Sequence, residues 1–258
     1  MKGFFLHTMG KQKEISVLGH LNELRRRLML CVIVLFCTIS VSFYLTKYVI
    51  NIFKSRAPDT QLIYTRPTEM IATYIQVSFY LGIALAMPFI IYQVLMFISP
   101  ALTRKEKRYL YAIIPAIALC FITGVAFAYF ILLPPGLRFL LSFGSDMAEP
   151  MITVSSYVGL LTTLIFWVGV VFEIPVVMYF VSKLGIVSPS WFASKRKWAF
   201  VGAFILSAII TPTMDPVNQT LVAVPIIVLY EIGIWVARLA QARSKAKVIA
   251  KRAPLPET

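Results

Sequence analysis

Charged residues are scarce in this chain of 258 residues, where they make up only 14% of the sequence. A soluble domain of this size carries about a quarter charged residues. Hydrophobic residues reach 59%, and five or six long apolar runs take up nearly the whole sequence. This pattern excludes an ordinary soluble protein and predicts an all-α integral membrane protein.

Acidic residues are the rarer charged type, with 11 of them against 25 lysines and arginines. The resulting net charge of +14 could suggest a nucleic-acid-binding protein. The basic residues, however, cluster in short segments between apolar runs, as membrane topology requires, and form no stripe on a soluble fold. We therefore expect no nucleic-acid partner.

Histidine and cysteine are also rare. Both histidines, His7 and His20, precede the first apolar run, which argues against a histidine-based protease or metal site in the membrane. The three cysteines, Cys31, Cys37 and Cys120, lie within apolar runs and lack disulfide or metal-site spacing. We interpret them as packing residues and expect no metal, no other cofactor and no catalytic residue.

Four apolar runs are long enough to cross a bilayer, at 1.5 Å per helical residue and about 30 Å of hydrocarbon. They are Leu28–Thr46, Met70–Ile98, Tyr109–Leu137 and Met151–Ser182. The third run is predicted to end at Pro134-Pro135. We expect no cleavable signal peptide, because the first apolar stretch, residues 3–6, is too short.

Two further apolar runs are shorter. Trp198–Ile210 has 13 residues, and Leu221–Ala237 has 17 residues interrupted by Pro225 and Glu231. We interpret them as a hairpin of short helices, the fifth and sixth spans, which must thin the bilayer or line a depression in it. Two ordinary tilted spans with different ends remain an alternative.

The distribution of basic residues predicts the topology. Of the 25 lysines and arginines, 20 lie in the N-terminal segment, the loop 99–108, the loop 183–197 and the C-terminal stretch that begins at Arg238. Six spans with cytoplasmic termini satisfy the positive-inside rule. The predicted parts are a cytoplasmic amphipathic segment (1–27), a six-helix transmembrane domain (28–240) and a basic cytoplasmic tail (241–258).

Glu173 is the single charge in the fourth run, and an ionisable side chain in hydrocarbon costs at least ~2.5 kcal/mol. Three interpretations remain open: a hydrogen-bonded structural acid, a group that draws water and lipid headgroups into the protein, or a proton relay or docking point for a partner. Glu231 is shallower, and we interpret it as structural or interfacial.

Two further acids lie in predicted cytoplasmic parts among basic residues. Glu23 is in an amphipathic segment whose leucines share one helical face, and Glu106 is the only acid among four bases in the loop 99–108. A topology anchor that binds anionic lipid would explain the arginines near Glu23 but not Glu23 itself. Together the two carboxylates could bind a partner that carries two guanidinium groups.

Several motifs resemble those of one family. The segment 20–28 resembles the HLxELRxRL signature of TatC proteins, and the loop 97–108 resembles their FxxPALxxxEKR signature. Further matches follow in order: Tyr92-Gln93, Ala126–Phe130, Phe172–Pro175, Thr211-Pro212, Gln219-Thr220, Ala223–Pro225 and Leu229–Ile232. The resemblance covers roughly residues 17 to 240.

The resemblance implies the core receptor of the twin-arginine translocase, which exports folded proteins across the inner membrane using the proton-motive force. It implies six helices in a concave, glove-like bundle, with the last two helices short. The expected partners are signal peptides with paired arginines, single-span proteins of the TatA and TatB type, and membrane lipids, in an oligomeric complex.

The resemblance also implies roles for individual residues. Signal-peptide binding is expected at Glu23, Glu106, Arg25, Leu102, Lys107 and Arg108. Glu173 corresponds to the buried acid on the concave side, and Thr211 and Gln219 correspond to positions where a partner helix docks.

Two other classes remain as alternatives. Broken helices and a midplane acid also suit an ion-coupled secondary transporter of a small solute, although the two halves show no internal repeat. An intramembrane enzyme is less favoured, because Glu173 and Glu231 lie in different runs without a companion motif.

Overall fold

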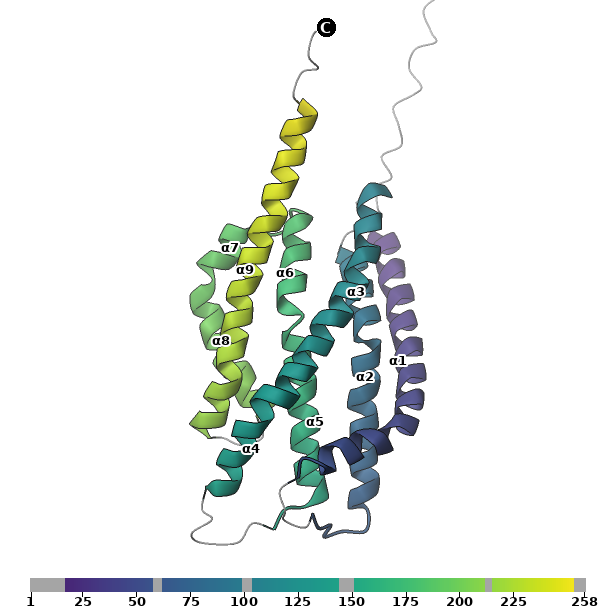
Figure 1. Cartoon of the computed structure of the whole chain (residues 1–258). Helices are drawn as coiled ribbons and strands as arrows, with labels where there is room; N and C mark the ends of the chain where they lie inside the picture. The colour runs from purple at the N-terminus through teal and green to yellow at the C-terminus, as the bar shows by residue number, and fades with distance from the viewer. Residues whose placement is uncertain (1–16, 58–61, 99–103, 144–150, 212–214, 253–258) are drawn as a thin grey trace, which may run out of the picture.

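A computed structural model of the chain describes residues 17–57, 62–98, 104–143, 151–211 and 215–252, without the side chains of residues 17, 18, 20, 98, 104–113 and 242–252. Its elements are helices throughout these ranges (Figure 1). In chain order they are α1 (Val17–Lys54), α2 (Glu69–Ile98), α3 (Arg104–Phe127), the π-helix η1 (Ala128–Leu132), α4 (Leu133–Ser142), α5 (Val154–Val171), α6 (Ile174–Lys183), α7 (Pro189–Ser194), α8 (Arg196–Ile210) and α9 (Pro216–Arg252).

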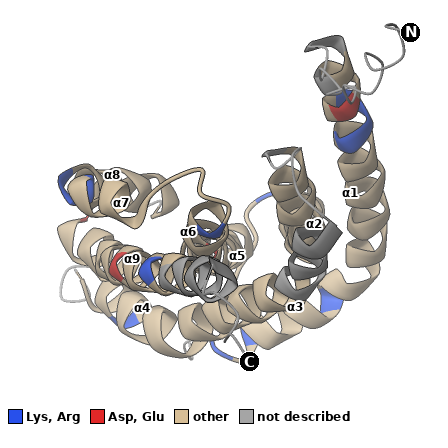
Figure 2. Ribbon diagram, turned by 90° about the horizontal axis from the view of Figure 1, so that it is seen from above, with Lys and Arg blue, Asp and Glu red and all other residues tan. Residues whose placement is uncertain are grey.

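Seen from above, the helices form a curved row (Figure 2). Helix α1 packs on α2, α2 packs on α3 and α5, and α6 and α8 both pack on α9. Ten of the 18 residues of α5 are buried, so this helix forms the centre of the core. The starts of α1 and α3 and the ends of α2, α6 and α9 lie at one end of the molecule, called the upper end here (Figure 1).

Five helical segments are long and apolar enough to cross a membrane: Leu21–Lys54, Glu69–Phe97, Ile114–Ser142, Val154–Lys183 and Pro216–Gln241. The all-helical membrane architecture predicted from composition is therefore confirmed. Helix α1 runs unbroken from Val17 to Lys54, so the amphipathic segment and the first span form one helix over the described residues.

The prediction that the third span ends at Pro134-Pro135 is wrong. Both prolines lie in the first turn of α4, directly after η1, and the helical segment continues to Ser142. The prolines are tolerated within a continuing helical segment because the π-helical turn η1 before them interrupts the regular α-helical hydrogen bonding that a proline would otherwise break. The fourth run, in contrast, is broken between α5 and α6 at Phe172 and Glu173.

The prediction of two short final helices is half correct. Helix α8 has only 15 residues, but α9 has 37. The apolar run in α9 ends at Ala237, before Arg238, and the helix then continues through a basic stretch rich in alanine, lysine and arginine, which are strong helix formers. The segment predicted as a separate tail from residue 241 is therefore helical as far as Arg252.

The lower end is held together by Glu69, at the start of α2. Its carboxylate accepts hydrogen bonds from the backbone N–H of Thr65 (2.9 Å) and from the N–H and hydroxyl of Ser155 (3.1 and 2.8 Å). An isolated parallel bridge joins Ile63 to Thr153 beside it. These contacts fix the start of α5 against the connection between α1 and α2.

Gly82 in α2 permits close packing of α1 on α2. A Cβ atom at this position would lie 2.7 Å from the Cα atom and 2.9 Å from the backbone nitrogen of Ile39 in α1. In the same interface the hydroxyl groups of Thr46 and Ser78 are 2.7 Å apart and share a hydrogen bond. The interface therefore depends on the absence of a side chain at position 82.

We expect Gly82→Ala to lower the melting temperature of the purified protein, because the backbone of Ile39 must move and overpacking typically costs ~1–3 kcal/mol. Gly202→Ala in α8 is the matched control. No atom lies within 4 Å of its added Cβ, and alanine favours a helix over glycine by ~1 kcal/mol. Equal changes in melting temperature for the Gly82→Ala and Gly202→Ala variants would contradict the close packing of Gly82 on Ile39.

Candidate functional site

A polar cleft lies near the upper end, between the start of α1 and the last turns of α2. Its volume is about 500 Å³, and it is lined by Asn22, Glu23, Arg26, Arg27, Leu30, Tyr92 and Gln93. The lining contains one carboxylate, two guanidinium groups and two amides, so it can bind a polar or charged ligand rather than an apolar one. Glu23 is the predicted signal-peptide contact that forms part of this lining.

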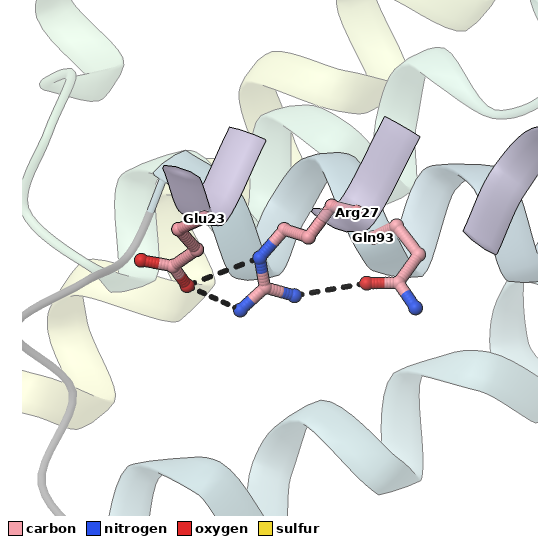
Figure 3. Close-up of polar contacts among 3 residues, drawn as sticks. All are labelled: Glu23, Arg27 and Gln93. Carbon is pink, nitrogen blue, oxygen red and sulfur yellow. Dashed lines mark hydrogen bonds and ion pairs between the residues drawn. The ribbon is translucent and has the colours of Figure 1, made fainter. Parts of the chain in front are cut away.

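Glu23 is paired within α1 (Figure 3). Its Oε1 atom accepts hydrogen bonds from Nη2 of Arg27 at 2.6 Å and from Nε at 3.1 Å. The Nη1 atom of Arg27 donates at 2.9 Å to Oε1 of Gln93, which extends the contact to α2. The anion predicted from sequence is thus held in a defined position by two further residues.

Of the other residues predicted to contact the signal peptide, the structure describes the side chain of Arg25 but not those of the loop before α3 or of its first turns. Arg25 is exposed on α1 and does not line the cleft. Glu106, Lys107 and Arg108 belong to the first turns of α3, but their side chains lie outside the described residues. Leu102 lies outside them altogether. The start of α3 is nevertheless at the same end of the molecule as the start of α1 (Figure 1).

The sequence prediction did not assign a function to Arg27 or Gln93. The spacing of four residues between Glu23 and Arg27 is typical of a helical ion pair and could have indicated this contact. The signals for Gln93 were its place in the Tyr92-Gln93 match and its amide within the second run, where Gln76 is a second glutamine. The contact of Gln93 with Arg27 depends on the packing of α1 on α2, which no local pattern reveals.

Glu173 lies at the break between α5 and α6. It is 3% exposed, and within the described part of the chain neither carboxyl oxygen makes a hydrogen bond. Nearby, Gly124 of α3 fits closely against Phe172, since an added Cβ would lie 2.8 Å from the Cγ atom of that ring. Buried polar groups in proteins are almost always hydrogen-bonded, so this carboxyl group is an exception.

The two residues expected to dock a partner helix make internal contacts. Thr211 is buried, and its hydroxyl donates to the backbone oxygen of Ser207 at 2.7 Å. The side-chain amide of Gln219 donates to the backbone oxygen of Phe204 at 3.1 Å. The Thr211 contact therefore lies within the last turn of α8, whereas the Gln219 contact joins α9 to α8.

Glu231 forms an ion pair between α8 and α9. Its two carboxylate oxygens accept from Nε and Nη2 of Arg196, at 2.6 and 2.8 Å. The hydroxyl of the adjacent Tyr230 donates to the backbone oxygen of Phe192 at 2.9 Å. These contacts agree with a structural role for Glu231, although its partner is Arg196, which is remote in sequence.

An apolar cleft lies between α2 and α5. Its volume is about 740 Å³, and its lining is mainly aromatic and aliphatic: Ala72, Ile75, Gln76, Phe79, Tyr80, Ile83, Phe166 and Trp167. Gln93 of the polar cleft and Ile83 are ten residues apart on α2, or about 15 Å along the helix axis. Helix α2 therefore connects a polar cleft near the upper end to an apolar cleft further down.

Known proteins share this sequence and fold. A family model described as "Sec-independent protein translocase protein (TatC)" matches residues 19–225. A TatC protein of Aquifex aeolicus is 39% identical over 232 residues, which cover 88% of this chain and 96% of the relative. A TatC protein of Carboxydothermus hydrogenoformans is 34% identical over 230 residues, covering 88% and 95%.

A crystal structure described as "Twin Arginine Translocase Receptor- TatC" superposes with a TM-score of 0.76 at 39% identity, covering 86% of this chain and 99% of the other. These matches confirm the resemblance derived from the motifs, and they favour it over the secondary transporter and the intramembrane enzyme. The chain therefore belongs to the TatC family and is the TatC receptor component of the twin-arginine translocase, a multi-pass membrane protein of protein transport.

Proposed function

We propose that the polar cleft binds the paired arginines of a signal peptide, with Glu23 as one carboxylate and Glu106 as the other. The observation that carries this proposal is the position of Glu23, whose Oε2 atom accepts no hydrogen bond from the described residues. Its side chain is 36% exposed, so an incoming guanidinium can reach it. Charge-assisted hydrogen bonds between guanidinium and carboxylate are strong and directional.

The proposed topology places this cleft at the cytoplasmic face. Six spans are formed by the five long apolar segments together with α8, which is short for a span. Lysines and arginines near the starts of α1 and α8 include Arg25, Lys195 and Arg196. Only five basic residues belong to the opposite side in this topology: Lys47 and Lys54 in the last part of α1, Arg56 and Arg66 between α1 and α2, and Arg138 in α4. The positive-inside rule then makes both termini cytoplasmic, in the inner membrane.

The apolar cleft between α2 and α5 provides a place for the apolar part of the signal peptide. That segment follows the arginines in the peptide, and the apolar cleft follows the polar cleft along α2 by about 15 Å. Arg25, Leu102, Lys107 and Arg108 are proposed as further contacts of the peptide outside the cleft, Leu102 for an apolar side chain and the basic residues for polar groups. The concave side of the curved row would then face the bound peptide.

The proposed partners are single-span proteins of the TatA and TatB type, which dock on α8 and α9 near Thr211 and Gln219. Export of the folded cargo then uses the proton-motive force in an oligomeric complex, without a cofactor. Helix α8 is the natural docking element, because its 15 residues extend only about 22 Å and leave bilayer thickness to be matched by a neighbour.

Glu173 is proposed to receive a hydrogen-bond donor from such a partner. Its burial disfavours the interpretation in which it draws water and headgroups, and the lack of an internal hydrogen bond among the described residues disfavours a purely structural acid. A donor from outside the chain would satisfy the carboxyl group. Because the carboxyl group is buried in the chain alone, this docking role, and equally a proton relay, requires the helices packed around Glu173 to move apart when a partner binds.

The direct test is peptide binding to the purified chain in lipid nanodiscs. A fluorescent signal peptide with paired arginines is compared with the same peptide carrying two glutamines. We expect at least a tenfold higher affinity for the arginine peptide, which corresponds to ~1.4 kcal/mol. Equal affinities would contradict the proposed recognition of the arginines.

A further inference from the structure

The two carboxylate oxygens of Glu23 are used unequally. Oε1 receives both hydrogen bonds from Arg27, whereas Oε2 receives none from the described residues (Figure 3). A carboxylate has about four acceptor positions, so half of its capacity remains for an external donor. The oxygen that an incoming group can use is therefore determined by the contact with Arg27.

Arg27 is itself fixed from a second helix. Its side chain is only 19% exposed, and Nη1 donates to Gln93 in α2 while Nε and Nη2 contact Glu23. Gln93 is 7% exposed, so its amide has little freedom to move. The planar guanidinium holds its donors in a fixed geometry, and it joins the α1 carboxylate to the buried α2 amide.

We propose that Arg27, held by Gln93, is a positioning residue for signal-peptide recognition. It fixes the carboxylate of Glu23 through Oε1 and presents Oε2 to the arginine of the peptide. This inference rests on the proposed function of the cleft and adds two residues to it. Arg27 acts through Glu23 and makes no contact with the peptide.

The geometry argues against the opposite role, in which Arg27 competes with the peptide. A competitor would occupy the exposed part of the carboxylate, yet Glu23 is more exposed than Arg27, and Oε2, which accepts no hydrogen bond from the described residues, is the oxygen that Arg27 does not contact. All three donor atoms of Arg27 that contact Glu23 or Gln93 can remain in place when a second guanidinium binds Oε2.

The test is a double-mutant cycle that measures affinity for the paired-arginine peptide in nanodiscs. Arg27→Lys keeps the charge but removes the fork that joins Glu23 to Gln93. We expect it to weaken binding about tenfold, and Gln93→Met to weaken it about threefold. In a Glu23→Gln background, neither change should weaken binding further, because both act through the Glu23 carboxylate.

Arg138→Lys, the same substitution on α4 near the lower end, is the matched control and should leave affinity unchanged. Melting temperatures of all variants verify that the fold is kept. A loss from Arg27→Lys that persists in the Glu23→Gln background overturns the positioning role alone, as does tighter binding by Arg27→Lys. Unchanged binding by Glu23→Gln itself overturns the docking of the arginine at Glu23, and the positioning role with it.

Discussion

Replacement of Glu106 by lysine is expected to abolish binding of a paired-arginine signal peptide. The change removes one charge-assisted contact, which contributes about 1.5–3 kcal/mol, and adds repulsion of about 1 kcal/mol between like charges. The combined loss of about 2.5–4 kcal/mol corresponds to a decrease of roughly 60- to 700-fold in affinity. Glu23 cannot compensate, because half of its acceptor capacity is already used by Arg27.

Peptide titration of the variant in nanodiscs, together with export of a tagged reporter by membrane vesicles, measures this effect. Asp59→Lys is the matched control, because it reverses a charge at a position that the sequence places between the end of α1 and the start of α2. It should bind the peptide normally. Retained cross-linking of the paired-arginine peptide to Glu106→Lys would show that Glu106 is not a docking residue.

Replacement of Glu173 by leucine is expected to separate stability from transport. The buried carboxyl group lacks a hydrogen bond among the described residues, and an unsatisfied buried polar group costs ~1–3 kcal/mol. A leucine of similar size should therefore raise the melting temperature of the chain alone. Export should nevertheless fall at least tenfold, because a partner's donor, worth ~1.4 kcal/mol or more, has lost its acceptor.

The comparison needs two measurements on the same variants. Melting temperature is measured on the purified chain, and export is measured in vesicles that contain the single-span partners. Glu173→Gln is the matched variant, since its amide still accepts a hydrogen bond and should retain much of the export. Normal export by the Glu173→Leu variant would show that transport does not require this carboxyl group.

The sequence was sufficient for the helical membrane architecture, because hydropathy and helix length follow from composition alone. It was not sufficient for the exact ends of the helices. The continuation past Pro134 depends on the π-helix η1 that precedes it, and the length of α9 depends on helix propensity beyond the apolar part. Charged residues and hydropathy indicate where a membrane-spanning segment leaves the hydrocarbon core of the bilayer. The helix itself can continue beyond that point.

The same distinction holds for the site. Glu23 and Glu173 stand out as isolated acids, so their chemistry could be predicted from sequence. Their partners could not, because contacts such as Arg27 with Gln93 and Arg196 with Glu231 join residues 66 and 35 positions apart. Such pairs follow from helix packing, which depends on close contacts like that of Gly82 with Ile39.

The most direct test of the account is a thermodynamic cycle between the peptide arginines and the two receptor carboxylates. Affinities of the paired-arginine and paired-glutamine peptides are measured on the unmodified chain and on the Glu23→Gln/Glu106→Gln variant. We predict that the variant binds both peptides equally, because the preference for arginine resides in these two groups. An undiminished preference for arginine in the variant would contradict the account.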